Sequence, residues 1–409
     1  MLKKIDINAF EGKETPFYYY DLDLLQTTVD RLKKESEKYD YTVHYALKAN
    51  TDDRVLQIIS EAGFGADCVS GNEVKKALEH NFSPEDIYYA GVGKTDTEIR
   101  AALIGNIGCF NCESKQEIGV ISQIASKMGV IAKIALRINP HINSKSHAYI
   151  TTGIEENKFG IQLWELDEVL SAVSTLENVE LIGLHFHIGS QIADLSVFKE
   201  LCLKVNEVNE YIGGKGFNLS ILNLGGGLGI DYVNPELNSI PDFGKFFETI
   251  HQTLKVKPLQ HVHFELGRSV VAHMGTLIAK VLFIKNGRSK SFAVVDAGMT
   301  ELIRPALYNS VHKIDNLTQN EIGVAGTKDD NLYDIVGPVC ETTDFLGRDI
   351  SLPSTFRGDL LAVWSVGAYG QSMASNYNLR ERAGVVYSDE LLIDTGQEEV
   401  SKQRIQANT

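Results

Sequence analysis

The chain alternates two kinds of hydrophobic pattern between Tyr41 and Arg268. Short runs of β-branched and aromatic residues predict strands, and the longer segments between them, with apolar residues at helical spacing, predict amphipathic helices. The predicted strands are Tyr41–Ala49, Gly65–Ser70, Ile87–Gly91, Cys109–Glu113, Ala132–Asn139, Leu181–Ile188, Ile221–Gly225 and His261–Glu265. The predicted helices include Asp53–Ala62, Asn72–Glu79, Lys115–Lys127, Trp164–Thr175, Ser196–Ile212 and Phe243–Leu254.

This alternation predicts an α/β fold. Strands that alternate with helices form a parallel sheet, and eight such units in about 230 residues match the usual size of a (β/α)8 barrel. We therefore predict a TIM-type (β/α)8 barrel at residues 25–275. An open, doubly wound sheet is the alternative.

The pattern changes after Met274, where strand-like runs follow one another without long helices. These runs are Thr276–Lys285, Ser291–Val295, Asn331–Val336, Leu360–Trp364 and Gly384–Tyr387. Glycine, proline and aspartate separate them, which predicts an antiparallel β-domain. A strand around Phe17–Tyr20 is predicted to join it, so residues 1–24 and 276–409 are assigned to this C-terminal β-domain. The last residues, Glu398–Thr409, are typical of a polar helix end or a loose tail.

Composition narrows the classes of function. The 409 residues are 43% hydrophobic and carry a formal net charge of −15, without a basic patch, which argues against a nucleic-acid partner. Five scattered cysteines do not indicate a disulfide framework, so a reducing compartment is expected. The N-terminus lacks the apolar region of a signal peptide, and no stretch is long enough to span a membrane. We expect a soluble, cytoplasmic protein.

Polar residues gather at the carboxyl ends of the predicted strands, where barrel enzymes build their active sites. They are Lys48, Asp67, Ser70, Arg137, Asn139, His187, Gly189, Ser190, the glycines 225–227, Glu265, Gly267 and Arg268. A lysine amine in a pocket is the group that forms a Schiff base with pyridoxal phosphate (PLP). A solvated lysine after a strand is the alternative for Lys48 considered alone.

Two further motifs bear on a cofactor. The run Gly225-Gly226-Gly227-Leu228-Gly229 lets backbone amides approach an anion such as phosphate, although a tight turn after a strand is the simpler alternative. The ring of His187 could stack on an aromatic cofactor, or His187 could be a core histidine. His185 and His187 lack the further ligands of a metal site, and Cys109 and Cys112 are interpreted as a buried cysteine pair without metal.

Several motifs together resemble one family. They are Tyr45–Asn50, His187–Gln191, Gly225–Gly229, Glu265–Arg268, Arg304–Tyr308, Cys340-Glu341 and Gly367–Gly370, in that order. From about residue 17 to 380 the chain closely resembles the PLP-dependent diaminopimelate decarboxylases, members of the alanine-racemase-like fold group. The resemblance implies decarboxylation of meso-2,6-diaminopimelate to L-lysine and CO2, the last step of lysine biosynthesis. Leu266 departs from the family, which more often has proline there; its loss is expected to loosen the turn.

The resemblance also implies residue roles. Lys48 carries PLP, His187 stacks on its ring, Glu265 pairs with the pyridine nitrogen, and Cys340 donates a proton. The other implied cofactor contacts are Asp67, Ser190, Gly226, Gly227, Gly267, Arg268 and Tyr369. The implied substrate contacts are Arg268, Arg304, Tyr308 and Tyr369, with Glu341 for the distal ammonium. The family further implies a homodimer in which Cys340 and Glu341 reach the partner's site.

A carboxylate at the ring nitrogen favours decarboxylation over racemisation, because it stabilises the cationic ring that accepts electrons. The first alternative is a decarboxylase of ornithine, arginine or carboxynorspermidine. The others are a non-catalytic PLP carrier and a barrel hydrolase that uses Glu265 with a second carboxylate. The segment His141–Lys158 is a candidate mobile lid, with an ordinary loop as its alternative.

Overall fold

In this computed structural model, most of the chain is described and forms two compact units. The described residues are 5–142, 158–288, 290–321 and 331–391. Most of the candidate lid His141–Lys158, and all of the tail Glu398–Thr409, lie outside them. The barrel unit comprises Thr28–Gly229 and Pro241–Val270, and the β-rich unit comprises Met1–Thr27, Ile230–Ile240 and Val271–Thr409.

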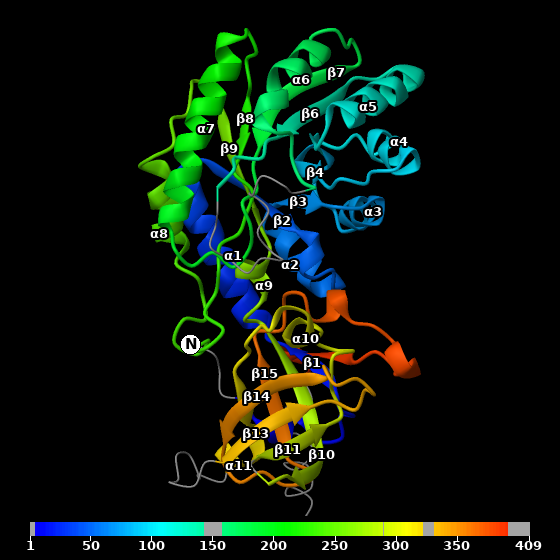
Figure 1. Ribbon diagram of the computed structural model, residues 1–409, viewed down its shortest axis with the longest axis vertical. Coiled ribbons are helices and arrows are strands. Elements are labelled where there is room, and N and C mark those ends of the chain that lie inside the picture. The colour runs from blue at the N-terminus through cyan, green and yellow to red at the C-terminus, as the bar shows by residue number, and fades with distance from the viewer. Residues whose placement is uncertain (1–4, 143–157, 289, 322–330, 392–409) are drawn as a thin grey trace, which may run out of the picture. The chain divides into compact units, whose positions relative to one another are not determined.

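The barrel unit contains a closed barrel of parallel strands (Figure 1). In barrel order the strands are β2 (Tyr41–Ala46), β3 (Gly65–Cys68), β4 (Ile87–Tyr89), β5 (Cys109–Cys112), β6 (Ala132–Arg137), β7 (Val179–His185), β8 (Ile221–Asn223) and β9 (His261–Leu266). The barrel closes where β2 pairs with β9, with Tyr41 opposite Val262. The predicted (β/α)8 class is therefore confirmed, and the open sheet was wrong. Most strands end before their predicted limits, because their carboxyl ends turn into the loops of the site.

Amphipathic helices follow the strands and lie outside the barrel (Figure 1). They are α1 (Leu22–Glu37), α2 (Asp53–Glu61), α3 (Gly71–Glu79), α4 (Asp96–Ile104), α5 (Lys115–Met128), α6 (Leu166–Val173), α7 (Ser196–Gly214) and α8 (Phe243–His251). Several begin at a side-chain cap, which satisfies free amides of the first turn. One cap is Ser70, whose side chain accepts from the Glu73 amide. Ser70 therefore starts a helix and does not end strand β3, and its predicted place among the polar groups of the site stays a prediction.

The barrel interior holds a pair of buried histidines on the two strands that close it, His44 on β2 and His263 on β9. His44 Nδ1 lies 2.9 Å from the carbonyl oxygen of Asp86, so this nitrogen carries the proton. His44 Nε2, 2.8 Å from His263 Nδ1, then accepts from it. Burial lowers the pKa of both histidines. Both rings are therefore neutral in the folded barrel.

This pair predicts loss of stability in mild acid. The histidine pKa is lowered in the folded state, so the unfolded chain binds the extra protons below about pH 6.5. For two such groups the free energy of unfolding should fall by up to about 2.7 kcal/mol per pH unit below that value. In the double variant His44→Leu/His263→Leu, the free energy of unfolding, measured by urea denaturation, should fall distinctly less between pH 7 and pH 5. An equally steep fall in the variant would contradict this account.

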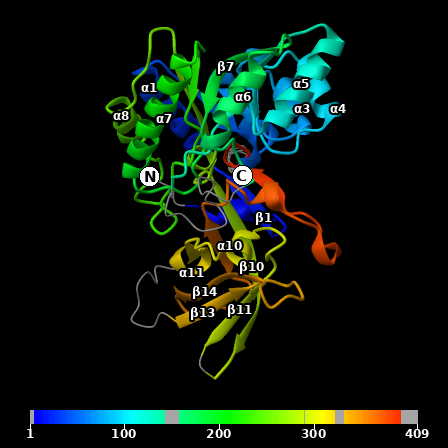
Figure 2. The same cartoon turned by 45° about the horizontal axis from the view of Figure 1, so that its top comes forward.

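The β-rich unit is built around the long strand β10, which pairs antiparallel with three neighbours. Its strands are β1 (Phe17–Tyr20), β10 (Gly275–Asn286), β11 (Ser291–Val295), β12 (Ile314–Asn316), β13 (Asn331–Val336), β14 (Phe345–Leu352), β15 (Leu360–Trp364) and β16 (Gly384–Tyr387). The predicted strand Phe17–Tyr20 does join this sheet. Most pairs are antiparallel as predicted, but two are parallel: β1 with β16, and β11 with β13. Strand β14 lies next to β13 and pairs antiparallel with it (Figure 2). The short helices are α9 (Arg268–Val271), α10 (Arg304–Tyr308) and α11 (Leu317–Glu321).

The predicted domain limits at residues 25–275 stay a prediction, and the compact units differ from them by a few residues at each limit and in one internal segment. Ile230–Ile240 follows the glycine run in the chain but groups with the β-rich unit. Tyr232 accepts a hydrogen bond from Arg304 at 2.9 Å, and Glu236 pairs with Lys313 at 3.0 Å. Across the described residues, no helix is long and apolar enough to cross a membrane.

Candidate active site

Lys48 lies just beyond strand β2 in a single 3-10 turn, Leu47–Ala49. The prediction that the strand continues to Ala49 was wrong, because the Asn50 amide bonds back to the carbonyl of Leu47 at 3.0 Å and closes the turn. Leu47 and Ala49 are buried, whereas the Lys48 side chain is 34% exposed. The turn is thus anchored by its neighbours and presents the amine at the carboxyl end of the barrel.

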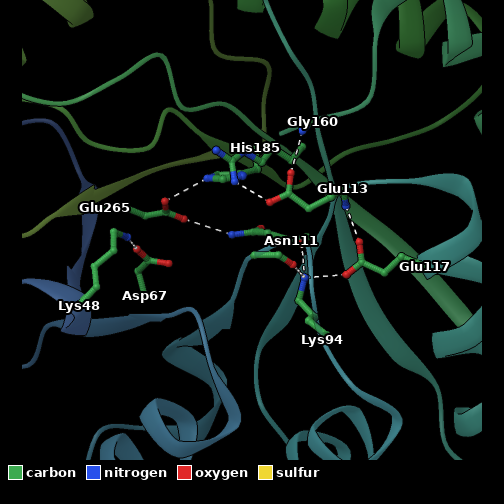
Figure 3. Close-up of polar contacts among 11 residues, drawn as sticks. Lys48, Asp67, Lys94, Asn111, Glu113, Glu117, Gly160, His185 and Glu265 are labelled. Atoms are coloured by element: carbon green, nitrogen blue, oxygen red, sulfur yellow. Dashed lines mark hydrogen bonds and ion pairs between the residues drawn. The ribbon is translucent and has the colours of Figure 1, made fainter. Parts of the chain in front are cut away.

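The amine of Lys48 pairs with Asp67, a fully buried carboxylate near the end of β3. Nζ lies 2.5 Å from Oδ2 (Figure 3). The other oxygen, Oδ1, is buried and has no hydrogen-bond partner among the described residues. Burial raises the pKa of Asp67, and so does the charge of Glu265, while Lys48 opposes both. Asp67 is therefore an acceptor with one oxygen still available to a further donor.

Glu265, near the end of β9, is buried and enclosed by three side-chain donors (Figure 3). Its Oε2 lies 2.9 Å from His185 Nε2, and its Oε1 accepts from Asn111 at 3.1 Å and from Asn223 at 2.8 Å. Burial alone would raise the pKa of Glu265, but His185, Lys48 and His187 outweigh it and hold this pKa below its usual value. Glu265 is therefore ionised, although it lies inside the barrel.

The glycine run passes very close to the end of β9. A Cβ atom on Gly226 would lie 1.8 Å from the carbonyl oxygen of Glu265, so no other residue fits without a backbone shift. Gly227 has φ of +108°, in the region that favours glycine. The Asn223 side chain accepts from the Gly225 amide at 2.8 Å and holds the start of the run. The packing thus requires glycine here, and backbone amides without side chains line the turn.

His187 stands beside this run and is half-buried. Its Nδ1 accepts from the Gly226 amide at 3.3 Å. Burial lowers the pKa of His187 to about 3, and the nearby cations Arg137 and Lys48 lower it too. A neutral, flat ring next to this glycine turn can stack on an aromatic group.

Arg268 supplies a buried positive charge at the start of α9. Its Nε and Nη2 atoms lie 3.3 and 2.9 Å from the Ser190 hydroxyl. The preceding residue, Gly267, packs against the Lys48 turn, because a Cβ there would lie 3.0 and 3.1 Å from those of Ala49 and Ala46. Leu266 is buried and pairs with Tyr45, so the strand ladder extends to this position. The loosening expected from the absence of proline stays a prediction.

Arg137, a cation near His187, is held by a buried ion pair. Its Nη1 lies 2.5 Å from Oε1 of Glu113, whose other oxygen accepts from the Gly160 amide at 2.7 Å. Glu113 therefore ties the end of β6 to the chain that follows the candidate lid (Figure 3). Cys109 and Cys112 are both buried and free, as the sequence indicated.

The donor set fits PLP, a flat aldehyde that carries a phosphate. Lys48 offers an amine, Glu265 an ionised carboxylate, and His187 a neutral ring face. The glycine turn, Ser190 and Arg268 offer donors for a phosphate. The orphaned oxygen of Asp67 shows that this site accepts at least one more polar group.

The remaining predicted residues belong to the β-rich unit. Cys340 and Glu341 are exposed, and the Glu341 carboxylate accepts from the Tyr377 hydroxyl at 2.7 Å. Arg304 is buried, where its Nη1 contacts His312 as well as Tyr232. Tyr308 lies in α10 and is half-buried, as is Tyr369, which has φ of +60°. The roles implied for these residues stay predictions.

Asp344 orders the turn that carries Cys340. Its two oxygens accept from the amides of Met299 and Val339, both at 2.6 Å. Gly298 and Gly337 leave no room for a Cβ beside this carboxylate. The exposed Cys340 thiol therefore lies on a turn that the hydrogen bonds of Asp344 hold in place.

Comparisons with known proteins agree with the fit of this site to PLP. A family described as "Pyridoxal-dependent decarboxylase, pyridoxal binding domain" matches residues 22–272. Diaminopimelate decarboxylase of Bacteroides thetaiotaomicron is 49% identical over 94% of this chain and 98% of its own length, and that of Aquifex aeolicus is 40% identical over 95% and 89%. This chain belongs to the PLP-dependent diaminopimelate decarboxylase family. The crystal structure of the Helicobacter pylori diaminopimelate decarboxylase complexed with L-lysine aligns with a TM-score of 0.86 at 37% identity and covers 93% of both chains.

Other members of the fold group are more distant. A lysine/ornithine decarboxylase from Vibrio vulnificus complexed with putrescine aligns with a TM-score of 0.79 at 21% identity, which indicates the shared fold alone. The family assignment thus rests on the diaminopimelate decarboxylases.

Sequence reasoning missed the donors around Glu265. Asn111 and Asn223 lie in short apolar strands, and His185 was considered only as a possible metal ligand. A polar side chain in a fully buried strand needs a partner, and this is the signal that could have drawn attention to all three.

Gly226→Ala tests the close approach of the glycine turn to β9. The added methyl group should displace the turn, lower the free energy of unfolding by about 2 kcal/mol or more, and weaken PLP binding. The matched control is Gly119→Ala in α5, where a Cβ meets nothing within 4 Å. It should be as stable as the parent or more so. Thermal melts and PLP titration measure both effects, and normal PLP binding by Gly226→Ala would contradict the prediction.

Proposed function

We propose that this protein decarboxylates meso-2,6-diaminopimelate to L-lysine and CO2 with PLP, as the last step of lysine biosynthesis in the cytoplasm. The observation that carries the proposal is the pairing of the exposed amine of Lys48 with Asp67 beside an ionised Glu265 in one barrel. Family membership supports the same reaction.

All of the proposed cofactor contacts except Tyr369 come from the barrel unit. Lys48 would hold the aldehyde carbon, Glu265 the ring nitrogen and His187 the ring face. The phosphate contacts are proposed to be Ser190, Gly226, Gly227, Gly267 and Arg268, with Tyr369 from the β-rich unit. When bound, PLP supplies an electron sink for the pair released when the carboxylate leaves.

The protein moves protons at two places. Asp67 Oδ2 lies within hydrogen-bond reach of Lys48 Nζ and can take its proton, which leaves the neutral amine that attacks a carbonyl carbon. Burial favours the protonated carboxyl of Asp67, which assists this transfer. We propose Cys340 as the donor that returns a proton to the carbon from which CO2 departs. An S–H group can donate a proton, and this one is exposed.

The substrate has a second amino-acid group at its far end. We propose that Arg268, Arg304 and Tyr308 bind the distal carboxylate, together with Tyr369, and that Glu341 binds the distal ammonium. A guanidinium fork suits a carboxylate. Ornithine has no distal carboxylate, so it would leave buried arginines without that partner at a cost of about 1–3 kcal/mol each.

Substrate comparison tests the proposal directly. CO2 release should give kcat/KM for meso-diaminopimelate at least about a hundredfold above that for ornithine, arginine or lysine, because the site would be built for a group they lack. Arg304→Met should reduce this ratio, mainly by raising the KM for diaminopimelate. A preference for ornithine would favour the alternative decarboxylase activity.

We further propose a homodimer in which Cys340 and Glu341 of one subunit serve the site of the other. Mixing Lys48→Ala with Cys340→Ala should then restore about a quarter of the parental activity, since half of the dimers are hybrids and each hybrid has one intact site. Subunit exchange is followed by mass spectrometry of differently tagged chains. Proven exchange with no recovered activity would refute site sharing.

A further inference from the structure

Glu265 draws donors from three different strands. His185 comes from β7, Asn111 from β5 and Asn223 from β8, and the side chains of all three are buried. The two asparagines share Oε1, whereas His185 alone, among the described residues, hydrogen-bonds Oε2. Each oxygen of the carboxylate is therefore oriented separately (Figure 3).

The hydrogen bond of His185 has a defined direction. An ionised carboxylate has no proton to give, so Nε2 of His185 carries the proton and donates it to Oε2. The other nitrogen, Nδ1, is buried and meets no hydrogen-bond partner in the described part of the chain. Among the described residues, the His185 ring therefore forms its hydrogen bond with Glu265. Asn223 differs, because it also holds the Gly225 amide.

The proposed function gives this contact a chemical role, and the inference rests on that function. If Glu265 faces the pyridine nitrogen, the two share one proton, which resides on the more basic of the two. Burial makes a carboxylate more basic and would draw the proton away from the ring. A hydrogen bond to the anion acts in the opposite direction, and so does the charge of Lys48, while the charge of Asp67 opposes it.

We propose that His185 is a positioning residue that keeps Glu265 anionic and turned toward the ring nitrogen, so that the shared proton stays on the ring. The cationic ring is the better electron sink. His185 thereby acts on the reaction through Glu265 without touching the substrate.

The test uses the holoenzyme reconstituted with PLP labelled with 15N in its ring, since the nitrogen chemical shift reports directly whether that atom is protonated. In the parent at pH 8 the shift should be that of a pyridinium. In His185→Leu it should move toward that of neutral pyridine, and kcat should fall about ten- to hundredfold, the loss expected for a hydrogen bond to a charged group. His185→Gln retains an N–H donor and should largely restore both values.

The matched control is His44→Leu, which removes another buried barrel imidazole that has no hydrogen bond to Glu265. The His44→Leu variant should be less stable than the parent, and its ring 15N chemical shift should remain that of a pyridinium. His185→Phe provides a second donor-free variant if His185→Leu does not fold.

Two results would overturn the inference. A pyridinium shift that persists in the donor-free His185 variants would show that the histidine is only structural, and so would an equal change of shift in His44→Leu. A parent protein that binds PLP without decarboxylating any basic amino acid would instead refute the proposed function, and the shift comparison would still report the effect of His185 on the ring.

Discussion

An ionised carboxylate buried in the barrel is the constraint on which the described site depends. A charge taken out of water is costly unless donors surround it. Glu265 meets this requirement with His185, Asn111 and Asn223, so strands β5, β7 and β8 each hold a polar residue at the same level as β9. Removing one donor would leave part of the charge uncompensated, whereas the apolar strand neighbours tolerate exchange more readily.

The same region depends on close backbone packing. Gly226 lies against the carbonyl of Glu265, and Gly267 lies against the turn that carries Lys48. Because both contacts exclude a Cβ, the amine, the carboxylate and the glycine turn keep fixed relative positions. A barrel is suited to this, since eight strand ends meet at one rim and each contributes one or two side chains.

In the β-rich unit, Cys340 and Arg304 lie in different environments. Its exposed Cys340 stands on a turn held by Asp344, while Arg304 is buried beside Tyr232 and His312. The thiol of Cys340 is thus accessible to solvent, whereas the aromatic and hydrogen-bonding neighbours of Arg304 hold its guanidinium in one orientation. The two kinds of residue therefore share a unit but differ in their surroundings.

Local patterns in the sequence determined much of this protein. The alternation of strand and helix periods predicted the barrel, since side-chain periodicity depends on residues only a few positions apart. The same patterns located Lys48, Asp67, the glycine run and Glu265 at strand ends, because a polar residue after an apolar run is visible without knowledge of its partner. The short turn around Lys48 escaped detection, because a single turn of three residues is too short to show a side-chain periodicity.

Tertiary structure alone decided which residues meet. His185, Asn111 and Asn223 lie 80, 154 and 42 residues from Glu265 along the chain, and nothing local to any of them indicates that carboxylate. Likewise, Tyr232 follows the barrel glycines in sequence yet packs with Arg304, 72 residues away. The physical reason is that strand order and barrel closure set these distances, so the ionisation of Glu265 follows from the fold and not from its neighbours in sequence.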